Sequence, residues 1–144
     1  MFSDWYDPIP DIIRATPAEQ ILQNDIYDIA PLSEWVRGRA TLLGDSAHAM
    51  TPNMGQGGCQ AIEDGLVLGR CLRDSSSIEA GLRTYQTQRL ARANKVLMLS
   101  RRIGQAMTQS NPVVCALRNF VLGITPPSAQ LRNLEGIMGH NLPS

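Results

Sequence analysis

The feature that most constrains this 144-residue chain is a glycine-rich segment between a short apolar run and a helical pattern. The segment covers residues 44–64 and reads Gly-Asp-Ser-Ala-His-Ala-Met-Thr-Pro-Asn-Met-Gly-Gln-Gly-Gly-Cys-Gln-Ala-Ile-Glu-Asp. The apolar run before it, residues 40–43, is typical of a brief buried strand. Residues 45–58 are rich in glycine, proline and asparagine, so they predict an ordered loop that leads into a helix.

The backbone of this loop is suited to holding a ligand. Gly55, Gly57 and Gly58 let a flat molecule approach the main chain, because no Cβ stands in the way. The first amides of the following helix carry a partial positive charge that stabilises an anion or a developing negative charge. Asp45, at the end of the apolar run, offers an acceptor for sugar-like hydroxyls. The sequence therefore predicts a binding site that needs no catalytic side chain.

The chain after this segment is predicted to be helical. Apolar residues recur at three- and four-residue spacing over residues 59–73 and again over residues 78–109, where arginines occupy the opposite face. After an Asn-Pro break, further helices are expected over residues 112–138. The last of them begins at Pro126 and ends near Ile137.

The N-terminal part predicts shorter elements. Two short helices are expected within residues 1–22, with Thr16 as an N-cap and Glu19 in the capping-box position. A strand is expected over residues 24–30, and a turn containing Gly38 leads to the apolar run. Two isolated strands cannot form a stable sheet. Their partners are then expected in a second copy of the chain or in polypeptide outside this sequence.

The charges are balanced in number but not in position. Thirteen acidic and thirteen basic residues give a net charge of zero, which argues against a nucleic-acid partner. Twelve of the thirteen carboxylates lie between Asp4 and Glu79, whereas the later part of the chain is rich in arginine. The basic half either contacts phosphates or an anionic membrane surface, or pairs with the acidic half of the same protein. We favour pairing within the protein.

The cysteines predict neither a metal site nor a disulfide framework. Cys59, Cys71 and Cys115 are odd in number and widely spaced, with no Cys-x-x-Cys pair. Free thiols of this kind are typical of a reducing compartment. The N-terminus does not have the pattern of a secretory leader, and the apolar residues 112–124 are too short to span a bilayer and include Arg118. We expect a cytoplasmic protein with no transmembrane segment.

Residues upstream of the loop extend its pattern. Together with Trp35, Gly38 and Arg39, the stretch from about residue 25 to residue 72 resembles the second flavin motif of the group A FAD-dependent monooxygenases. Within this aromatic hydroxylase superfamily it is most similar to zeaxanthin-epoxidase-like and salicylate-hydroxylase-like members. The resemblance implies a mostly helical α+β fold, the C-terminal portion of an FAD/NAD(P)-binding α/β (Rossmann-like, GR2-type) fold with only a few short strands.

The same resemblance implies two parts of the chain. Residues 1–34 would be a remnant of the substrate-domain sheet with its connecting helices. Residues 35–144 would be the C-terminal part of the FAD-binding domain, with the flavin loop at residues 44–58 followed by the helices described above.

The cofactor implied by the resemblance is FAD, with NAD(P)H as co-substrate. In the family, the aspartate that matches Asp45 hydrogen-bonds a ribityl hydroxyl of FAD, and the positions that match Pro52 and residues 55–58 line the isoalloxazine edge. Amides near Gly57 and Gly58 would stabilise the negative charge of reduced flavin. The implied reaction uses NAD(P)H and O2 to transfer one oxygen atom to an organic substrate. The implied cofactor-binding residues are Gly44, Asp45, Pro52, Gly55, Gln56, Gly57 and Gly58.

The chain also departs from the family pattern. The Gly-x-Gly-x-x-Gly fingerprint, which holds the FAD pyrophosphate in complete members, does not occur in this sequence. Ile29 and Gln86 stand where relatives often have arginine and glutamate. We therefore expect one part of a monooxygenase that needs an N-terminal half or a homo-oligomer. The alternative is a non-catalytic helical interaction module that keeps the flavin loop as scaffold and binds a partner through residues 78–138.

Other side chains in the segment have simpler interpretations. Gly-Asp-Ser at residues 44–46 suggests an esterase, but His140 lacks the preceding aspartate that would orient it. His48 is expected to hold the loop rather than act as a base. Met50 and Met54 are expected to fill the core. Glu63 and Asp64 are expected to interact favourably with the dipole of the helix and to have no catalytic role.

Overall fold

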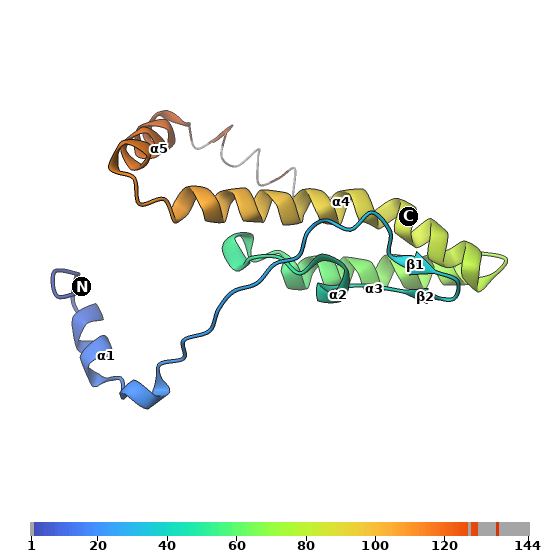
Figure 1. Cartoon of the computed structure of the whole chain (residues 1–144), viewed down its shortest axis with the longest axis horizontal. Helices are drawn as coiled ribbons and strands as arrows, with labels where there is room; N and C mark the ends of the chain where they lie inside the picture. The colour runs from blue at the N-terminus through green and yellow to red at the C-terminus, as the bar shows by residue number, and fades with distance from the viewer. Residues whose placement is uncertain (1, 127, 130–134, 136–144) are drawn as a thin grey trace.

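Two long helices lying side by side form the centre of the molecule (Figure 1). The computed structural model describes residues 2–126, 128–129 and 135. Helix α3, Gly57–Asp74, and helix α4, Ile78–Met107, are joined by a short turn and run antiparallel. Ser77 caps α4, because its hydroxyl oxygen accepts a hydrogen bond from the Ala80 amide at 3.2 Å. The helices expected over residues 59–73 and 78–109 are therefore confirmed, with ends that differ by at most two residues.

A glycine allows the two helices to approach closely near their turn. A Cβ built on Gly81 would lie 2.9 Å from the carbonyl oxygen of Cys71 and 3.1 Å from Cα of Leu72. Away from the turn, apolar side chains from both helices and from the segment before the loop form the core. Its buried members are Trp35, Ala47, Val67, Cys71, Tyr85 and Ala93.

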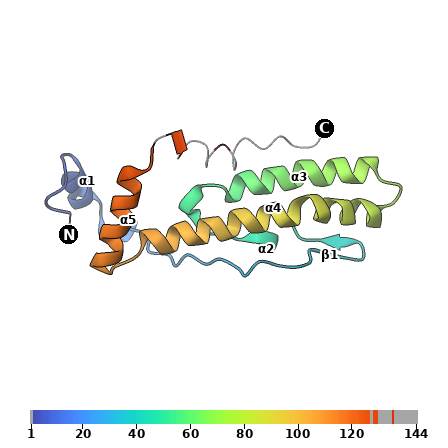
Figure 2. The same cartoon turned by 90° about the horizontal axis from the view of Figure 1, so that it is seen from above.

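The short strands form a small hairpin against α4 (Figure 2). Strand β1, Val36–Arg37, pairs antiparallel with β2, Ala40–Thr41, and Gly38 has a φ of +59° in the turn. The expected strand over residues 40–43 therefore exists only in its first half. The expectation that it is buried is wrong, since Leu42 and Leu43 are 38% and 41% exposed. The ribbon packs on α4 through the buried Val36, but residues 42–43 lie beyond its paired part.

The strand expected over residues 24–30 is wrong. These residues form no strand, because among the described residues none provides a second strand to pair with them. Side chains of α4 hold the segment instead. Arg101 pairs with the Asp28 carboxylate at 2.6 Å and donates to the Ile29 carbonyl at 2.8 Å.

The N-terminal segment contains helix α1, Ile9–Ala15, and the 3₁₀ turn η1, Ala18–Gln20. The two expected short helices are present, but the capping assignment is wrong. Thr16 ends α1 instead of beginning the next helix, and its hydroxyl donates to the Ile12 carbonyl at 2.8 Å. Pro17 follows it, and a residue before proline favours an extended backbone.

The loop expected over residues 45–58 is more regular than the sequence suggested. It contains helix α2, Asp45–His48, and the 3₁₀ turn η2, Pro52–Met54. Each is about one turn long, which is too short for apolar periodicity to reveal.

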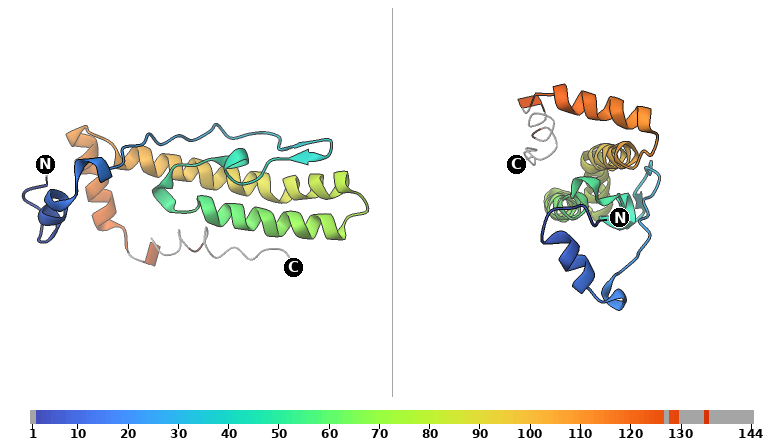
Figure 3. Two further views of the ribbon diagram at one scale, coloured as in Figure 1. Left: turned by 90° about the horizontal axis from the view of Figure 1, so that it is seen from below. Right: turned by 90° about the vertical axis from the view of Figure 1, so that its left-hand side faces the viewer.

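Helix α5, Pro112–Ile124, begins at Asn111, whose side-chain oxygen accepts from the Val113 and Val114 amides. Helix α5 and helix α1 lie at the same end of the α3–α4 pair but on opposite sides of it (Figure 3). The helix expected from Pro126 to about Ile137 lies largely outside the described residues. In the described part of the chain, the fold is mostly helical with one two-stranded ribbon. Helices of membrane-spanning length and hydropathy are absent from these residues.

Candidate functional site

Gly44 determines how the chain enters the loop at residues 44–58. It precedes α2 with a φ of +57° and a ψ of −141°, a backbone conformation open essentially to glycine alone. A Cβ at this position would lie 3.3 Å from Cβ of Ala61 on α3. The Gly44 amide donates to the Asp64 carboxylate at 2.9 Å. The sharp turn therefore places Asp45 at the first position of α2.

The Asp45 side chain is available to a ligand. It is exposed, and its carboxylate has no hydrogen-bond or ion-pair partner within the described part of the chain. Its backbone is constrained, because the Asp45 carbonyl accepts from the Ala49 amide at 3.1 Å. A carboxylate with free oxygens on a fixed backbone can accept hydrogen bonds from sugar-like hydroxyls.

The 3₁₀ turn η2 is held against α4. The Asn53 side chain donates to the Thr51 hydroxyl at 2.8 Å and to the Ser100 carbonyl at 3.3 Å. A side chain on Gly104 would collide with the Asn53 amide, so glycine at 104 makes this approach possible. Gly55 ends the turn in the left-handed region, with a φ of +62°. These contacts fix the loop just before α3.

The start of α3 presents unoccupied donors. The amides of Gly57, Gly58 and Cys59 lie in the first helical turn, where an α-helix supplies no acceptor. The Gln56 side chain caps none of them, and no acidic residue lies in that turn. They therefore face outward with the positive end of the helix dipole.

The space above these amides is open. A Cβ built on Gly55 or Gly58 would meet nothing within 4 Å, and one built on Gly57 would meet only Met50, at 3.8 Å. An open glycine surface beside free amides fits the edge of a flat, electron-rich ring. The residues present therefore fit a flavin. Gly44 and Asp45 at the start of α2 lie on an element that contacts α3, whereas Pro52 is an exposed residue on η2.

A buried polar network holds the loop at residues 44–58 against α3 and α4. The side chain of Asp64 is fully buried and accepts from three groups: the Gly44 amide at 2.9 Å, His48 Nε2 at 2.6 Å and Arg89 Nε at 2.8 Å. Burial alone would raise the pKa of Asp64, but the hydrogen bonds from His48, Gly44 and Arg89 outweigh it and lower the pKa. The carboxylate is therefore ionised and accepts only, so His48 carries its proton on Nε2.

Arg89 joins this network to a second carboxylate. It is 1% exposed, and it donates to Gln60 Oε1 and to the carboxylates of Glu63 and Asp64. Arg92 binds Glu63 through two parallel hydrogen bonds of 2.8 Å. Burial opposes ionisation of Glu63, but its arginine partners prevail and its pKa is lowered. The negative charges of two carboxylates are thus balanced by the positive charges of two guanidinium groups.

Sequence reasoning assigned Glu63 and Asp64 the wrong role. They do not act on the helix dipole, because they lie beyond the first turn of α3 and are paired with arginines of α4. The sequence feature that could have revealed this pairing is a charged residue on the buried stripe of each helix. The stripe of α3 consists of Gln60, Asp64, Val67 and Cys71, and that of α4 includes Tyr85, Arg89, Ala93 and Val96. A charge on a buried stripe requires an opposite charge facing it.

Two other expectations about this region are met, but Met50 and Met54 are only half-buried and do not belong to the core. His48 holds the loop through its bond to Asp64, and its ring lies 5.7 Å from that of Trp35. The arginines of α4 pair with acidic residues earlier in the chain, as the ion pairs of Arg89, Arg92 and Arg101 show. Gln86, which stands where relatives often have glutamate, contacts the segment before β2. Its Oε1 accepts from the amides of Trp35 and Val36 at 2.6 and 2.9 Å, and so holds β1.

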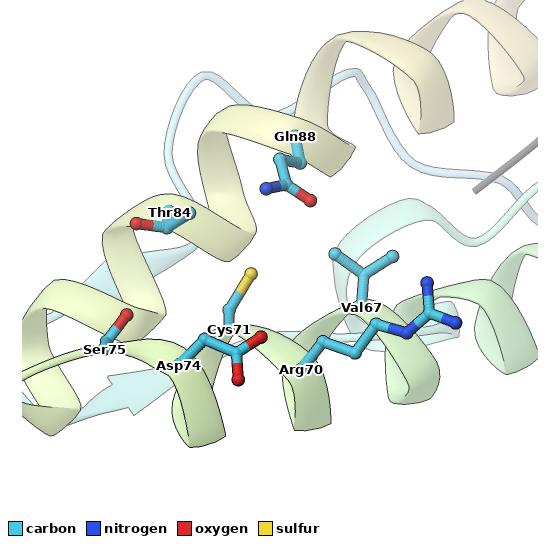
Figure 4. A pocket seen from close by; sticks show the side chains of 7 residues that line it. All are labelled: Val67, Arg70, Cys71, Asp74, Ser75, Thr84 and Gln88. Atoms are coloured by element: carbon cyan, nitrogen blue, oxygen red, sulfur yellow. The ribbon is translucent and has the colours of Figure 1, made fainter. Parts of the chain in front are cut away.

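A separate cleft of about 300 Å³ lies between α3 and α4 near their turn (Figure 4). The Cys71 thiol faces it, with Asp74 and Gln88 nearby. Burial raises the pKa of the Cys71 thiol, which disfavours the reactive thiolate. All three cysteines are free thiols, and no metal-binding cluster of His, Cys, Asp or Glu exists among the described residues.

Comparison with known proteins adds independent information. The family described as FAD binding domain matches residues 18–100. The chain is 51% identical over 121 residues to the aurachin C monooxygenase/isomerase of Stigmatella aurantiaca, covering 84% of this chain and 32% of that protein. It is 43% identical over 122 residues to a chloroplastic zeaxanthin epoxidase of Oryza sativa subsp. japonica, covering 78% of this chain and 18% of that protein.

Solved structures agree with these sequence matches. The structure of Klebsiella pneumoniae HpxO complexed with FAD and uric acid superposes with a TM-score of 0.78 and 34% identity, over 94% of this chain and 34% of that one. An HpxO variant complexed with FAD gives a TM-score of 0.84 at 32% identity, over 94% of this chain and 36% of that one. The chain thus spans about a third or less of the length of the proteins compared here.

Proposed function

The chain belongs to the FAD binding domain family, and from this membership we propose that it is the C-terminal FAD-binding part of a flavin-dependent monooxygenase. The observation that carries the proposal is the loop at residues 44–58, where the free Asp45 carboxylate and the open amides of α3 are held on one buried network. The names of the relatives, a monooxygenase and an epoxidase, support hydroxylation or epoxidation of an organic substrate. NAD(P)H and O2 would be the co-substrates.

Each part of the loop has a proposed role toward FAD. The Asp45 carboxylate accepts a hydrogen bond from a ribityl hydroxyl. Pro52 and residues 55–58 border the ring, and the amides of Gly57 and Gly58 donate to its electron-rich edge. Gly44 supplies the turn, and Gln56, which is 8% exposed, supports the start of α3. A bound flavin would supply hydride acceptance from NAD(P)H and O2 activation, while the protein binds and orients it.

The remaining contacts to FAD are proposed to come from other polypeptide. This sequence has no Gly-x-Gly-x-x-Gly motif, and the chain spans about a third or less of its relatives. We assign residues 1–34 to the remnant of a substrate domain and residues 35–144 to the FAD-binding domain. An N-terminal half or a second copy of the chain would complete the site. The three free thiols support a reducing location such as the cytoplasm.

Quenching of flavin fluorescence on titration with the purified chain tests the proposal. We expect saturable but weak binding, with a dissociation constant of tens of micromolar or weaker, because the pyrophosphate contacts are missing. Asp45→Ala should weaken binding further. Asp74→Asn is the matched control, since it removes an exposed carboxylate at the far end of α3. Absence of saturable binding by the unaltered chain would contradict the proposal for this polypeptide.

A second candidate function rests on the surface of α5. The exposed residues Val113, Leu117, Phe120, Val121 and Ile124 share one face of this helix. An apolar face of this kind is suited to a protein partner. The chain would then be a helical interaction module in which the flavin loop is only scaffold. Flavin binding that is lost in Asp45→Ala would favour the first candidate over this one.

A further inference from the structure

Asp64 contacts both ends of the helix that carries Asp45. Its Oδ2 atom accepts from the amide of Gly44, which precedes α2, and from Nε2 of His48, the last residue of α2. The distances are 2.9 and 2.6 Å, and the Asp64 and His48 side chains are both fully buried. One carboxylate oxygen therefore clamps the whole of this one-turn helix to α3.

A helix as short as α2 needs such an external support. An isolated helical turn is unstable, because its few hydrogen bonds do not offset the cost of ordering the backbone. Gly44 also has many accessible backbone conformations, so contacts from its surroundings are needed to select this one. Without the clamp, the Asp45 side chain would still be present, but its position would not be fixed.

Arg89 keeps the clamp itself in place. Its Nε donates to the second oxygen of Asp64 at 2.8 Å, and its Nη2 donates to both the carbonyl and the side-chain oxygen of Gln60. The carboxylate therefore has a partner on each oxygen and cannot rotate without breaking one of them. Glu63, the adjacent residue, binds Arg89 and Arg92 but has no contact with Gly44 or His48 among the described residues.

We propose that Asp64 is a positioning residue for flavin binding, which acts by clamping both ends of α2 so that Asp45 faces the ribityl chain. The inference rests on the proposed function, because it requires Asp45 to be a flavin ligand. The Asp64 side chain is fully buried, and both of its oxygens are occupied by Gly44, His48 and Arg89. The effect of Asp64 on binding must therefore pass through Asp45.

A double-mutant cycle on the full 144-residue chain tests this dependence. Asp64→Asn should lower FAD affinity about tenfold, as loss of an orienting partner commonly does. In an Asp45→Ala background, the same change should lower affinity by less than about twofold, because the group being positioned is gone. Glu63→Gln is the matched control. It disturbs the same arginines from the neighbouring position and should leave FAD affinity within about twofold of the unaltered chain.

Amide hydrogen exchange gives a second reading that does not require flavin. Exchange at Gly44 and at Ala49, the amides that border α2, should become faster in Asp64→Asn and stay unchanged in Glu63→Gln. If Asp64→Asn does not fold, His48→Leu is measured instead, since it releases only the C-terminal end of α2. It should give a smaller loss of affinity, which again disappears in the Asp45→Ala background.

The outcomes separate this inference from the proposed function. Equal losses of affinity in Asp64→Asn and Glu63→Gln, or a loss that persists fully without Asp45, would overturn the positioning role. If the unaltered chain binds no flavin, the proposed function fails for this chain, and the inference that Asp64 positions Asp45 for flavin fails with it. Faster amide hydrogen exchange in Asp64→Asn alone would then support only the structural role of Asp64 in holding α2.

Discussion

Gly44 combines two constraints that other residue types do not satisfy together. Its backbone lies in a region that side chains rarely adopt, and its Cα faces Ala61 on α3 so closely that a Cβ would approach within 3.3 Å. The glycines at the start of α3 are different. Gly58 has ordinary helical geometry and open space around it, so a side chain there costs nothing in the isolated chain. Gly44 is thus required by the fold, whereas Gly58 leaves space for the ligand.

Gly44→Ala is expected to destabilise the chain by about 1–3 kcal/mol, because it forces a non-glycine residue into a strained conformation. Urea unfolding followed by circular dichroism measures the change. Gly58→Ala, the control, should leave stability unchanged or raise it by up to about 1 kcal/mol, since alanine favours helix over glycine. Similar losses in both variants would refute the distinction.

Gly58→Ala is expected to affect flavin instead. A methyl group above the first turn of α3 occupies the space assigned to the ring edge, so FAD affinity should fall about tenfold or more, which corresponds to about 1.4 kcal/mol. Fluorescence quenching under the conditions used for the unaltered chain gives this ratio. Unchanged affinity would place the ring away from Gly58.

The buried carboxylates predict how stability depends on pH. The pKa values of Asp64 and Glu63 are lowered in the folded state, because hydrogen bonds from His48, Arg92 and Arg89 outweigh the cost of burial. Groups with depressed pKa values stabilise the fold above their unfolded values of about 4, and that contribution is lost as the pH falls through the folded values. We expect the free energy of unfolding to decrease steadily below about pH 4. Denaturant titrations from pH 7 downward measure it, and a smaller decrease is expected in Asp64→Asn.

The helices and the strands differed in how well the sequence predicted them. The ranges of α3 and α4 were predicted closely, because apolar periodicity and capping are local properties of the chain. The strand expected at residues 24–30 was wrong, because a strand exists only with a partner, and here Arg101 supplies the contacts instead. Helix α2 was missed because one turn has no period to detect, and it is held by Asp64 from a distant part of the sequence.

The packing of α3 against α4 gives a prediction for Gly81, which lies at their interface. Gly81→Ala should destabilise the chain by about 1–3 kcal/mol, because the new methyl group would press on the backbone of Cys71 and Leu72. Gly69→Ala on α3 is the matched control. Nothing lies within 4 Å of its built Cβ, so helix propensity alone should stabilise the chain by about 0.4–1 kcal/mol. Thermal unfolding of both variants shows whether the two changes in stability have opposite signs.

The end of the molecule that carries α1 and α5 (Figure 3) exposes large apolar side chains. Helix α5 has no buried residue, and α1 at the same end exposes Ile12 and Ile13. Relatives extend well beyond the region that matches this chain. The ion pairs of Arg89 and Arg92 with Glu63 and Asp64 are instead largely buried between α3 and α4.

Self-association of the isolated chain is the corresponding prediction. Size-exclusion chromatography with light scattering should show species larger than 15.8 kDa, because the α5 face would otherwise remain in water. Leu117→Lys with Phe120→Lys should shift the population toward monomer. Asn119→Lys adds a charge to the opposite side of α5 and should leave the population unchanged. A monomeric unaltered chain would contradict this view of the surface.

The sequence by itself determined the two long helices, the glycine-dependent entry into α3 and the family of FAD binding domains to which the chain belongs. Each depends on residues close together in the chain, where spacing and backbone freedom have direct structural consequences. Only the tertiary structure decided that Asp64 meets Arg89, His48 and Gly44, because these groups come together when α3 packs on α4 and α2 folds against both. The position of Asp45 therefore depends on a buried hydrogen bond between Gly44 and Asp64, which are 20 residues apart in the chain. A local pattern does not encode that contact.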